Sequence, residues 1–223
     1  MASMLCLGGE GVKRRAAALL KRGGVRLCTP ADWAALLVSA VASPFVVLPV
    51  FAVAITARYS PDVAHFLRWS GIAVFFSTVV PLSYVLAGVR RGRLSDVHVM
   101  YREQRGGPFA VALVSSAVGT AVLKAVGAPA PLVAVGAAMV CNGVVFAAIT
   151  TRWKVSLHLS VFAGCVACAA VLVDARFWAL ALFVPAILWA RVRRTRHSPA
   201  QGAVAIAVAV AVTLAVLAGL NRS

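Results

Sequence analysis

The sequence is poor in acidic residues: only 6 of its 223 residues are Asp or Glu, and charged residues of both signs make up 13%. A soluble domain carries about 25% charged residues. With 62% hydrophobic residues and a mean hydropathy of +0.93, the chain lacks the polar surface that would cover a water-soluble globule. Lipid must therefore solvate much of the chain, which forms one membrane domain.

The few carboxylates also limit the metal chemistry that is available. No DDxxD motif is present, and only Asp96 and Glu103 lie near the candidate site described below, so a two-metal site is not expected. We expect neither a metal nor an organic cofactor. The five cysteines show no disulfide framework, and the CxxC of Cys165 and Cys168 lies in an apolar run of small residues typical of helix packing.

We also expect no cleavable signal peptide, because the first 32 residues contain no adequate apolar core. We interpret residues 1–32 as a basic cytosolic or interfacial segment, with residues 16–20 against the membrane surface. Residues 33–223 then form the membrane domain.

Apolar runs dominate that domain, and about 20 apolar residues suffice to cross a bilayer as a helix. The candidate spans are residues 33–57, 67–89, 109–126, 131–151, 159–174, 177–190 and 203–220. The fifth and sixth are short and form a tight helical hairpin or a partly re-entrant pair. Thr29–Pro30 and Ser198–Pro199 pair a cap residue with a proline at helix starts. The pattern predicts an all-α, polytopic transmembrane helical bundle with six or seven spans.

The net charge of +16 comes from basic residues in short segments between the apolar runs. This placement favours anionic head groups or a phosphorylated substrate over nucleic acid, which we do not expect as a partner. Most basic residues fall in the N-terminal segment and in the loops after the second, fourth and sixth spans. The positive-inside rule therefore places the N-terminus and these loops in the cytoplasm of an integral, multi-pass membrane protein.

Three of these cytoplasmic loops, at residues 90–108, 152–158 and 190–201, hold most of the polar residues of interest. They include His98, His158 and His197, which are three of the four histidines. An even number of crossings separates each loop from the next, so all three loops can meet at one membrane face. Arginine, histidine and serine gathered at one face could hold a phosphate by charge-assisted hydrogen bonds.

The spacing of these residues is specific. Arg191 is followed after five residues by His197, and Gln201 stands four positions further on. Ser156-Leu157-His158 precedes this group, and Arg105 lies three residues before Pro108, with His98 seven residues before Arg105. In this order the residues resemble K-x6-R-P, P-S-G-H and S-R-x5-H-x3-D, the signature of the type 2 phosphatidic acid phosphatase superfamily. The resemblance covers about residues 90–215 and indicates a divergent prokaryotic member.

The resemblance implies a membrane lipid phosphatase that forms a phosphohistidine intermediate. His197 would be the nucleophile and His158 the general acid. The implied phosphate-binding residues are Arg102, Arg105, Ser156 and Arg191, with Lys154 in place of the missing lysine. Gln201 takes the position of an aspartate but cannot neutralise an imidazolium, so Asp96 or Glu103 would supply that charge, with His98 in support.

Two other hypotheses stay open. One is a metal-dependent prenyl-diphosphate enzyme, which the missing Asp-rich motif disfavours. The other is a non-catalytic lipid-binding or transport protein, for which Gln201 and the polar span residues Lys124 and Asn142 give some support. The lipid itself, isoprenoid or glycerolipid, phosphate or diphosphate, is left open, as is assembly into a homo-oligomer.

The positive-inside bias generates a topological prediction. Cys6 and Cys28 lie in the basic N-terminal segment and serve as natural labels. A membrane-impermeant thiol reagent should leave them unmodified in intact cells and modify them once the cells are opened. Labelling in intact cells would show that the orientation is wrong.

Overall fold

The structure is a computed structural model that describes residues 29–95, 104 and 106–220. The regular structure of these residues is helical, without strands, which confirms the predicted all-α bundle. The segments are, in chain order, α2 (Pro30–Val41), α3 (Pro44–Tyr59), α4 (Val63–Val74), η2 (Phe75–Val79), α5 (Val80–Arg90), α6 (Gly106–Ala125), α7 (Ala130–Arg152), α8 (Leu157–Leu172), η4 (Ala175–Phe183), α9 (Val184–Arg193) and α10 (Pro199–Leu220). The basic segment at residues 1–28, including residues 16–20 that we expect against the membrane surface, lies outside the described residues.

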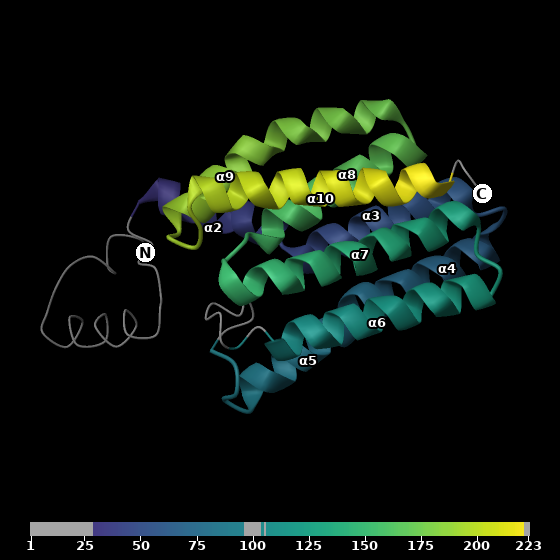
Figure 1. The fold of residues 1–223 in the computed structure, drawn as a ribbon, viewed down its shortest axis with the longest axis horizontal. Helices are drawn as coiled ribbons and strands as arrows, with labels where there is room; N and C mark the ends of the chain where they lie inside the picture. The colour runs from purple at the N-terminus through teal and green to yellow at the C-terminus, as the bar shows by residue number, and fades with distance from the viewer. Residues whose placement is uncertain (1–28, 96–103, 105, 221–223) are drawn as a thin grey trace, which may run out of the picture.

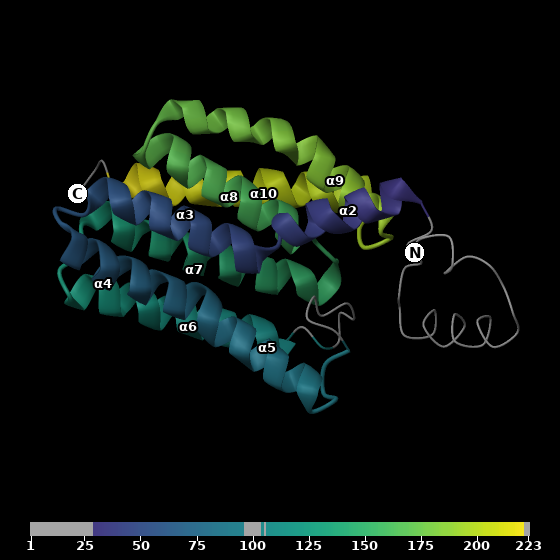
Figure 2. The ribbon, with the colours of Figure 1, turned by 180° about the vertical axis from the view of Figure 1, so that it is seen from behind.

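The helices form an elongated bundle in which most of them run along the long axis (Figure 1). α2 and α9 lie together at one end, as the reverse view also shows (Figure 2). We call this the histidine end, because α8 and α10 begin there, with His158 in the first turn of α8 and His197 just before α10. Among the described residues, five helical segments are long and apolar enough to cross a membrane, and the bent pair α2–α3 makes six. α8 is a shorter apolar helix of 16 residues at the predicted fifth span.

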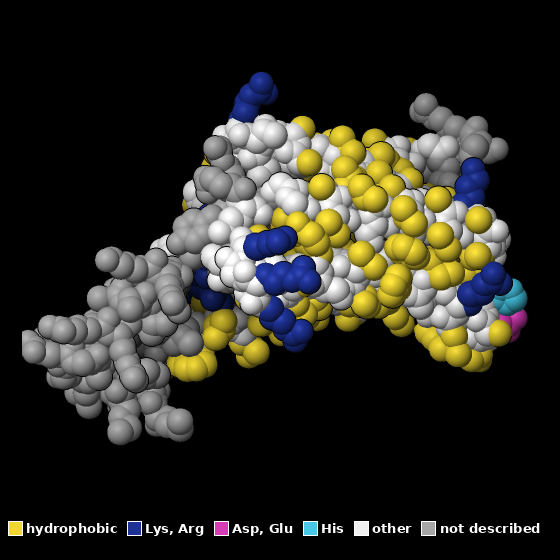
Figure 3. Space-filling view, turned by 90° about the horizontal axis from the view of Figure 1, so that it is seen from below, with side chains coloured by type: hydrophobic (Ala, Val, Ile, Leu, Met, Phe, Trp, Pro, Cys, Tyr) yellow, Lys and Arg dark blue, Asp and Glu magenta, His cyan; other side chains and the backbone are white. Residues whose placement is uncertain are grey.

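Large apolar side chains face outward from the bundle. Leu182 is 81% exposed and Val63 is 71% exposed. Figure 3 shows hydrophobic side chains over the middle of one face, with Lys and Arg gathered toward its two ends. An apolar surface of this extent is stable against hydrocarbon rather than water, and the helices satisfy their backbone hydrogen bonds internally. The chain is a multi-pass membrane protein.

The first span, predicted as one helix over residues 33–57, consists of α2 and α3, whose axes differ by 45°. Ser43 is the N-cap of α3, and Pro44 is its first residue. Proline lacks an N–H and disfavours a helical residue before it, and Ser43 is indeed extended (φ −61°, ψ 139°), so the helix breaks before Pro44. The prediction of an unbroken helix is therefore wrong at this point.

The second and sixth spans are longer than predicted. The second covers Val63–Arg90 and contains the π-helical turn η2 shortly before Pro81, which cannot donate to the preceding turn. The sixth covers Ala175–Arg193, because Asp174 caps η4 by accepting the N–H of Arg176 at 2.8 Å. The Arg176 guanidinium also holds the pKa of Asp174 at about 2, so this carboxylate remains charged at the bundle end.

α2 and α9 are fastened to each other at the histidine end. The Thr29 hydroxyl accepts the N–H of Asp32, and the Asp32 carboxylate accepts the N–H of Thr29, which confirms the predicted helix cap. Arg193 then donates from Nε to Asp32 at 2.9 Å and from Nη2 to Thr29 at 3.0 Å. The last turn of α9, which also carries Arg191, is thereby held against the start of α2.

The core at the histidine end joins α7, α8, α9 and α10. Leu159 and Ala205 are fully buried, and Ile187 belongs to the same cluster. Small residues such as Ala205 let neighbouring helices approach closely. Because Leu159 follows His158 and Ile187 lies one turn before Arg191, both polar residues extend from closely packed segments.

Candidate functional site

The described part of the chain contains the residues that resemble P-S-G-H, which we call the second motif, and S-R-x5-H-x3-D, which we call the third. Their residues are Lys154, Ser156, His158, Arg191, His197 and Gln201. The proposed residues of the first motif lie outside the described residues, and these are Asp96, His98, Arg102, Glu103 and Arg105.

The two described motif loops are shorter than predicted. α7 continues to Arg152 and α8 begins at Leu157, so His158 lies in the first turn of α8 rather than before it. Hydropathy had excluded this polar residue from the span, but Ser156 provides an N-cap position and the helix starts directly after it. Arg191 likewise lies in the last turn of α9, whereas His197 precedes α10, as predicted.

His158 and Arg191 contact each other across the interface between α8 and α9. Each is 5% exposed, and Nη1 of Arg191 lies 3.5 Å from Nε2 of His158. A guanidinium group can only donate hydrogen bonds, so the ring nitrogen is the acceptor wherever this contact forms a hydrogen bond. A buried cation beside an imidazole forms a local environment that attracts an anion.

His197 is positioned by the start of α10. Its Nδ1 lies 3.3 Å from Oε1 of Gln201, and the ring is 8% exposed. The same oxygen accepts the N–H of Ser198 at 3.1 Å, and the Ser198 hydroxyl accepts the N–H of Gln201 at 3.3 Å. Ser198 and Gln201 thus form a reciprocal helix cap, which fixes the amide that faces the histidine.

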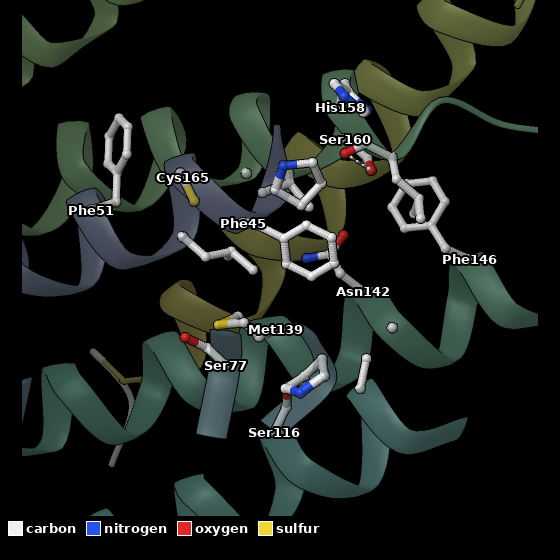
Figure 4. Close-up of a pocket in the computed structure, with 18 of the residues that line it drawn as sticks. Phe45, Phe51, Ser77, Ser116, Met139, Asn142, Phe146, His158, Ser160 and Cys165 are labelled. Atoms are coloured by element: carbon white, nitrogen blue, oxygen red, sulfur yellow. Dashed lines mark hydrogen bonds between the residues drawn. The ribbon is translucent and has the colours of Figure 1, made fainter. Parts of the chain in front are cut away.

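A cavity of about 270 Å³ brings these residues together. His158, Arg191 and His197 line one part of it, although they come from distant parts of the chain. Apolar side chains of α3, α7 and neighbouring helices line most of the remainder, and Figure 4 shows Phe45, Phe51, Met139 and Phe146 among them. Lys154, Ser156 and Gln201 are close in sequence to lining residues but do not themselves line the cavity.

The sequence reasoning missed Ser43, which lines the same cavity. This residue is 7% exposed, and its side chain does not cap α3. α3, α8 and α10 therefore all begin near the cavity, after Ser43, Ser156 and Ser198. Helix N-termini carry the positive end of the helix dipole, so three helix starts near one cavity favour an anion. The available signal was Ser43–Pro44, a cap-and-proline pair inside an apolar run.

The second residue that the sequence reasoning missed is Asp32. Asp32 forms an ion pair with Arg193, which lies two residues after Arg191 on α9. Asp32 therefore helps to position the cavity-lining Arg191 side chain, although Asp32 itself does not line the cavity. Within the described residues, no three His, Cys, Asp or Glu side chains are grouped in a way that could hold a metal ion. Cys165 and Cys168 are free thiols that line the apolar part of the cavity.

The fold and the site define a multi-pass helical membrane protein with a basic, histidine-containing pocket at the end of an apolar cavity. Comparison of the chain with protein-family models, with curated proteins and with solved structures gives no match.

The Ser156 hydroxyl generates a prediction, because it is fully buried and has no hydrogen-bond partner among the residues that the structure describes. An orphaned buried hydroxyl costs about 1–3 kcal/mol, so Ser156→Ala should leave the melting temperature in detergent unchanged or raise it. If Ser156 binds phosphate, as the resemblance implies, the same variant should also weaken the stabilisation of the wild-type protein by orthovanadate, a phosphate analogue.

Ser160→Ala is the matched control, since the Ser160 hydroxyl donates to the Leu157 carbonyl at 3.2 Å. It should lower the melting temperature and retain the vanadate effect. If Ser156→Ala lowered the melting temperature and retained the full vanadate effect, Ser156 would be a structural residue only.

Proposed function

We propose that this chain is a membrane lipid phosphatase that hydrolyses an isoprenoid or glycerolipid phosphate or diphosphate through a phosphohistidine. The observation that supports the proposal most is the meeting of His158, Arg191 and His197 at the end of an apolar cavity. A lipid phosphate has the same division into a charged head group and a hydrocarbon chain. The resemblance to the type 2 phosphatidic acid phosphatases adds a role for each residue.

In this proposal His197 is the nucleophile. Because Nδ1 faces the acceptor oxygen of Gln201, it carries the ring hydrogen, and the lone pair of Nε2 is left for attack on phosphorus. The P–N bond forms while the P–O bond to the leaving group breaks. Water then attacks phosphorus and gives its proton to the neutral His158, the P–N bond breaks, and inorganic phosphate leaves.

His158, in its protonated form, donates a proton to the leaving oxygen and becomes neutral, and Arg191 binds the phosphoryl oxygens beside it. Phosphoryl transfer depends mainly on positioning and charge neutralisation, which a buried guanidinium and the dipoles of the helices that begin near the cavity provide. The remaining proposed phosphate ligands are Lys154, Ser156, Arg102 and Arg105. On the charge bias of the sequence, we place the N-terminus and the histidine end at the cytoplasmic face.

A non-catalytic lipid-binding protein is the second candidate, and Gln201 is the observation that favours it. Its helix-capping bonds explain its presence without any catalysis. A transport function has less support: Lys124 is exposed in the last turn of α6, and the Asn142 amide donates to the Ala138 carbonyl and to Thr213.

Removal of the proposed nucleophile is the direct test. His197→Ala should lower the hydrolysis of phosphatidate and of prenyl diphosphate in detergent by at least roughly a thousandfold, because no P–N bond can form. His65→Ala is the matched control, since His65 lies at the opposite end of the bundle, paired with Asp62 at 2.8 Å. Wild-type rates in His197→Ala would contradict the assignment.

Gln201→Glu tests the missing charge. Glu keeps both the reach to the ring and the capping geometry, and its carboxylate stabilises the imidazolium that forms on attack. We expect the rate to rise at least about tenfold, or roughly 1.4 kcal/mol of transition-state stabilisation. An unchanged rate, measured with the same substrates at equal folded protein, would show that charge at this position does not limit catalysis.

Metal dependence separates the phosphatase from a prenyl-diphosphate enzyme. The proposed chemistry uses histidine and arginine, so hydrolysis should persist in a chelator, and vanadate should inhibit by mimicking the five-coordinate phosphoryl group. Complete loss of activity in the chelator, restored by magnesium, would favour the metal-dependent enzyme instead.

A further inference from the structure

The cavity extends far beyond the histidines. Along α8, its lining residues run from His158 to Cys168, which corresponds to roughly 15 Å at 1.5 Å per helical residue. Along α3 they run from Pro44 to Ile55, a similar depth. The hydrocarbon core of a bilayer is about 30 Å thick, so this depth matches that of one leaflet.

The wall beyond the histidines suits hydrocarbon. Its lining includes Phe45, Phe51 and Met139, and its few polar groups are partly bound to protein. The Asn142 amide donates at 2.9 Å to the Ala138 carbonyl and at 3.0 Å to the Thr213 hydroxyl. A polar ligand would find few hydrogen-bond partners there, whereas a methylene chain requires none.

The volume limits how many chains can enter. Drug-sized ligands occupy pockets of roughly 300–1,000 Å³. At about 270 Å³ spread over the depth of one leaflet, this cavity is narrow, and its shape matches a single hydrocarbon chain.

We propose that the substrate is a single-chain lipid phosphate or diphosphate whose hydrocarbon chain fills this cavity, and that Gly164 keeps the cavity open halfway along. This inference rests on the proposed function and narrows its substrate class. The phosphoryl group lies at His158, Arg191 and His197, and the chain extends between α3, α7 and α8. A two-chain glycerolipid leaves its second chain outside.

Gly164 is the position at which chain length can be tested. It lies on α8 between His158 and Cys168 and lines the cavity. A Cβ added there would meet only the Thr213 hydroxyl, at 3.4 Å, which is ordinary contact. Because Gly164 and Thr213 both line the cavity, we expect a larger side chain at this position to occupy part of the space of the lipid chain.

The experiment measures kcat/KM for a homologous series of n-alkyl phosphates from butyl to octadecyl. Burial of each methylene should raise kcat/KM roughly fourfold at most, so for the wild-type protein kcat/KM should rise with chain length and then level off once the cavity is full. For Gly164→Phe, kcat/KM should level off at a shorter chain and fall at least roughly tenfold for hexadecyl phosphate, while kcat/KM for butyl phosphate is unaffected. Gly164→Val, which replaces the larger variant if that does not fold, should level off at an intermediate chain length.

Gly71→Phe is the matched control, because Gly71 is exposed on α4, away from the cavity, and nothing lies within 4 Å of an added Cβ. It should retain the wild-type profile. An unchanged profile in folded Gly164→Phe and Gly164→Val, or equal hydrolysis of phosphatidate and its one-chain lyso form, would overturn the inference.

Binding distinguishes this inference from the proposed function. Non-hydrolysable n-alkyl phosphonates should raise the melting temperature of the wild-type protein, and this rise should increase with chain length. In Gly164→Phe the rise should level off at a shorter chain. If no alkyl phosphate were hydrolysed but this dependence held, catalysis would be wrong and the one-chain cavity right. If alkyl phosphates were hydrolysed without any dependence on chain length, the cavity assignment would be wrong.

Discussion

A chain that crosses hydrocarbon must satisfy its backbone hydrogen bonds within each helix, and this constraint determines where the protein can bind a charged group. Free N–H groups remain only where helices begin. α3, α8 and α10 begin near the same cavity, after Ser43, Ser156 and Ser198. The bend at Pro44 matters for this reason, because an unbroken first span would have no helix start at that depth.

The burial of Arg191 imposes a second constraint. A guanidinium that is 5% exposed has lost most of its hydration, which costs several kcal/mol unless charges and hydrogen bonds compensate. Among the described carboxylates, Asp32 and Asp174 form ion pairs with Arg193 and Arg176, and Asp62 is hydrogen-bonded to His65. In the proposed function, a bound phosphate would bring to the histidine end a negative charge that this sequence, with 6 acidic residues, supplies sparingly.

The order of the spans could be predicted from the sequence because hydrophobic length decides which segments cross a membrane. The Thr29 cap could be predicted because its signal is local. The break at Ser43 could not be predicted, since a hydropathy average over some 20 residues hardly changes at one serine and one proline. The clamp between Asp32 and Arg193 joins residues 161 positions apart, and no local pattern signals it. The cavity depends on how side chains such as Phe45 fill the space between helices, which follows from packing alone.

Gln201 connects the fold to the proposed chemistry through one atom. Its Oε1 accepts the N–H of Ser198 at 3.1 Å and faces Nδ1 of His197 at 3.3 Å. A carbonyl oxygen has two lone pairs, so both contacts can form together. The helix cap fixes the amide, and the amide in turn orients the imidazole, so the position of His197 follows from the folding of α10. An amide in place of a carboxylate keeps this orientation and gives up only the charge, which is compatible with a slow catalyst and does not require an inactive one.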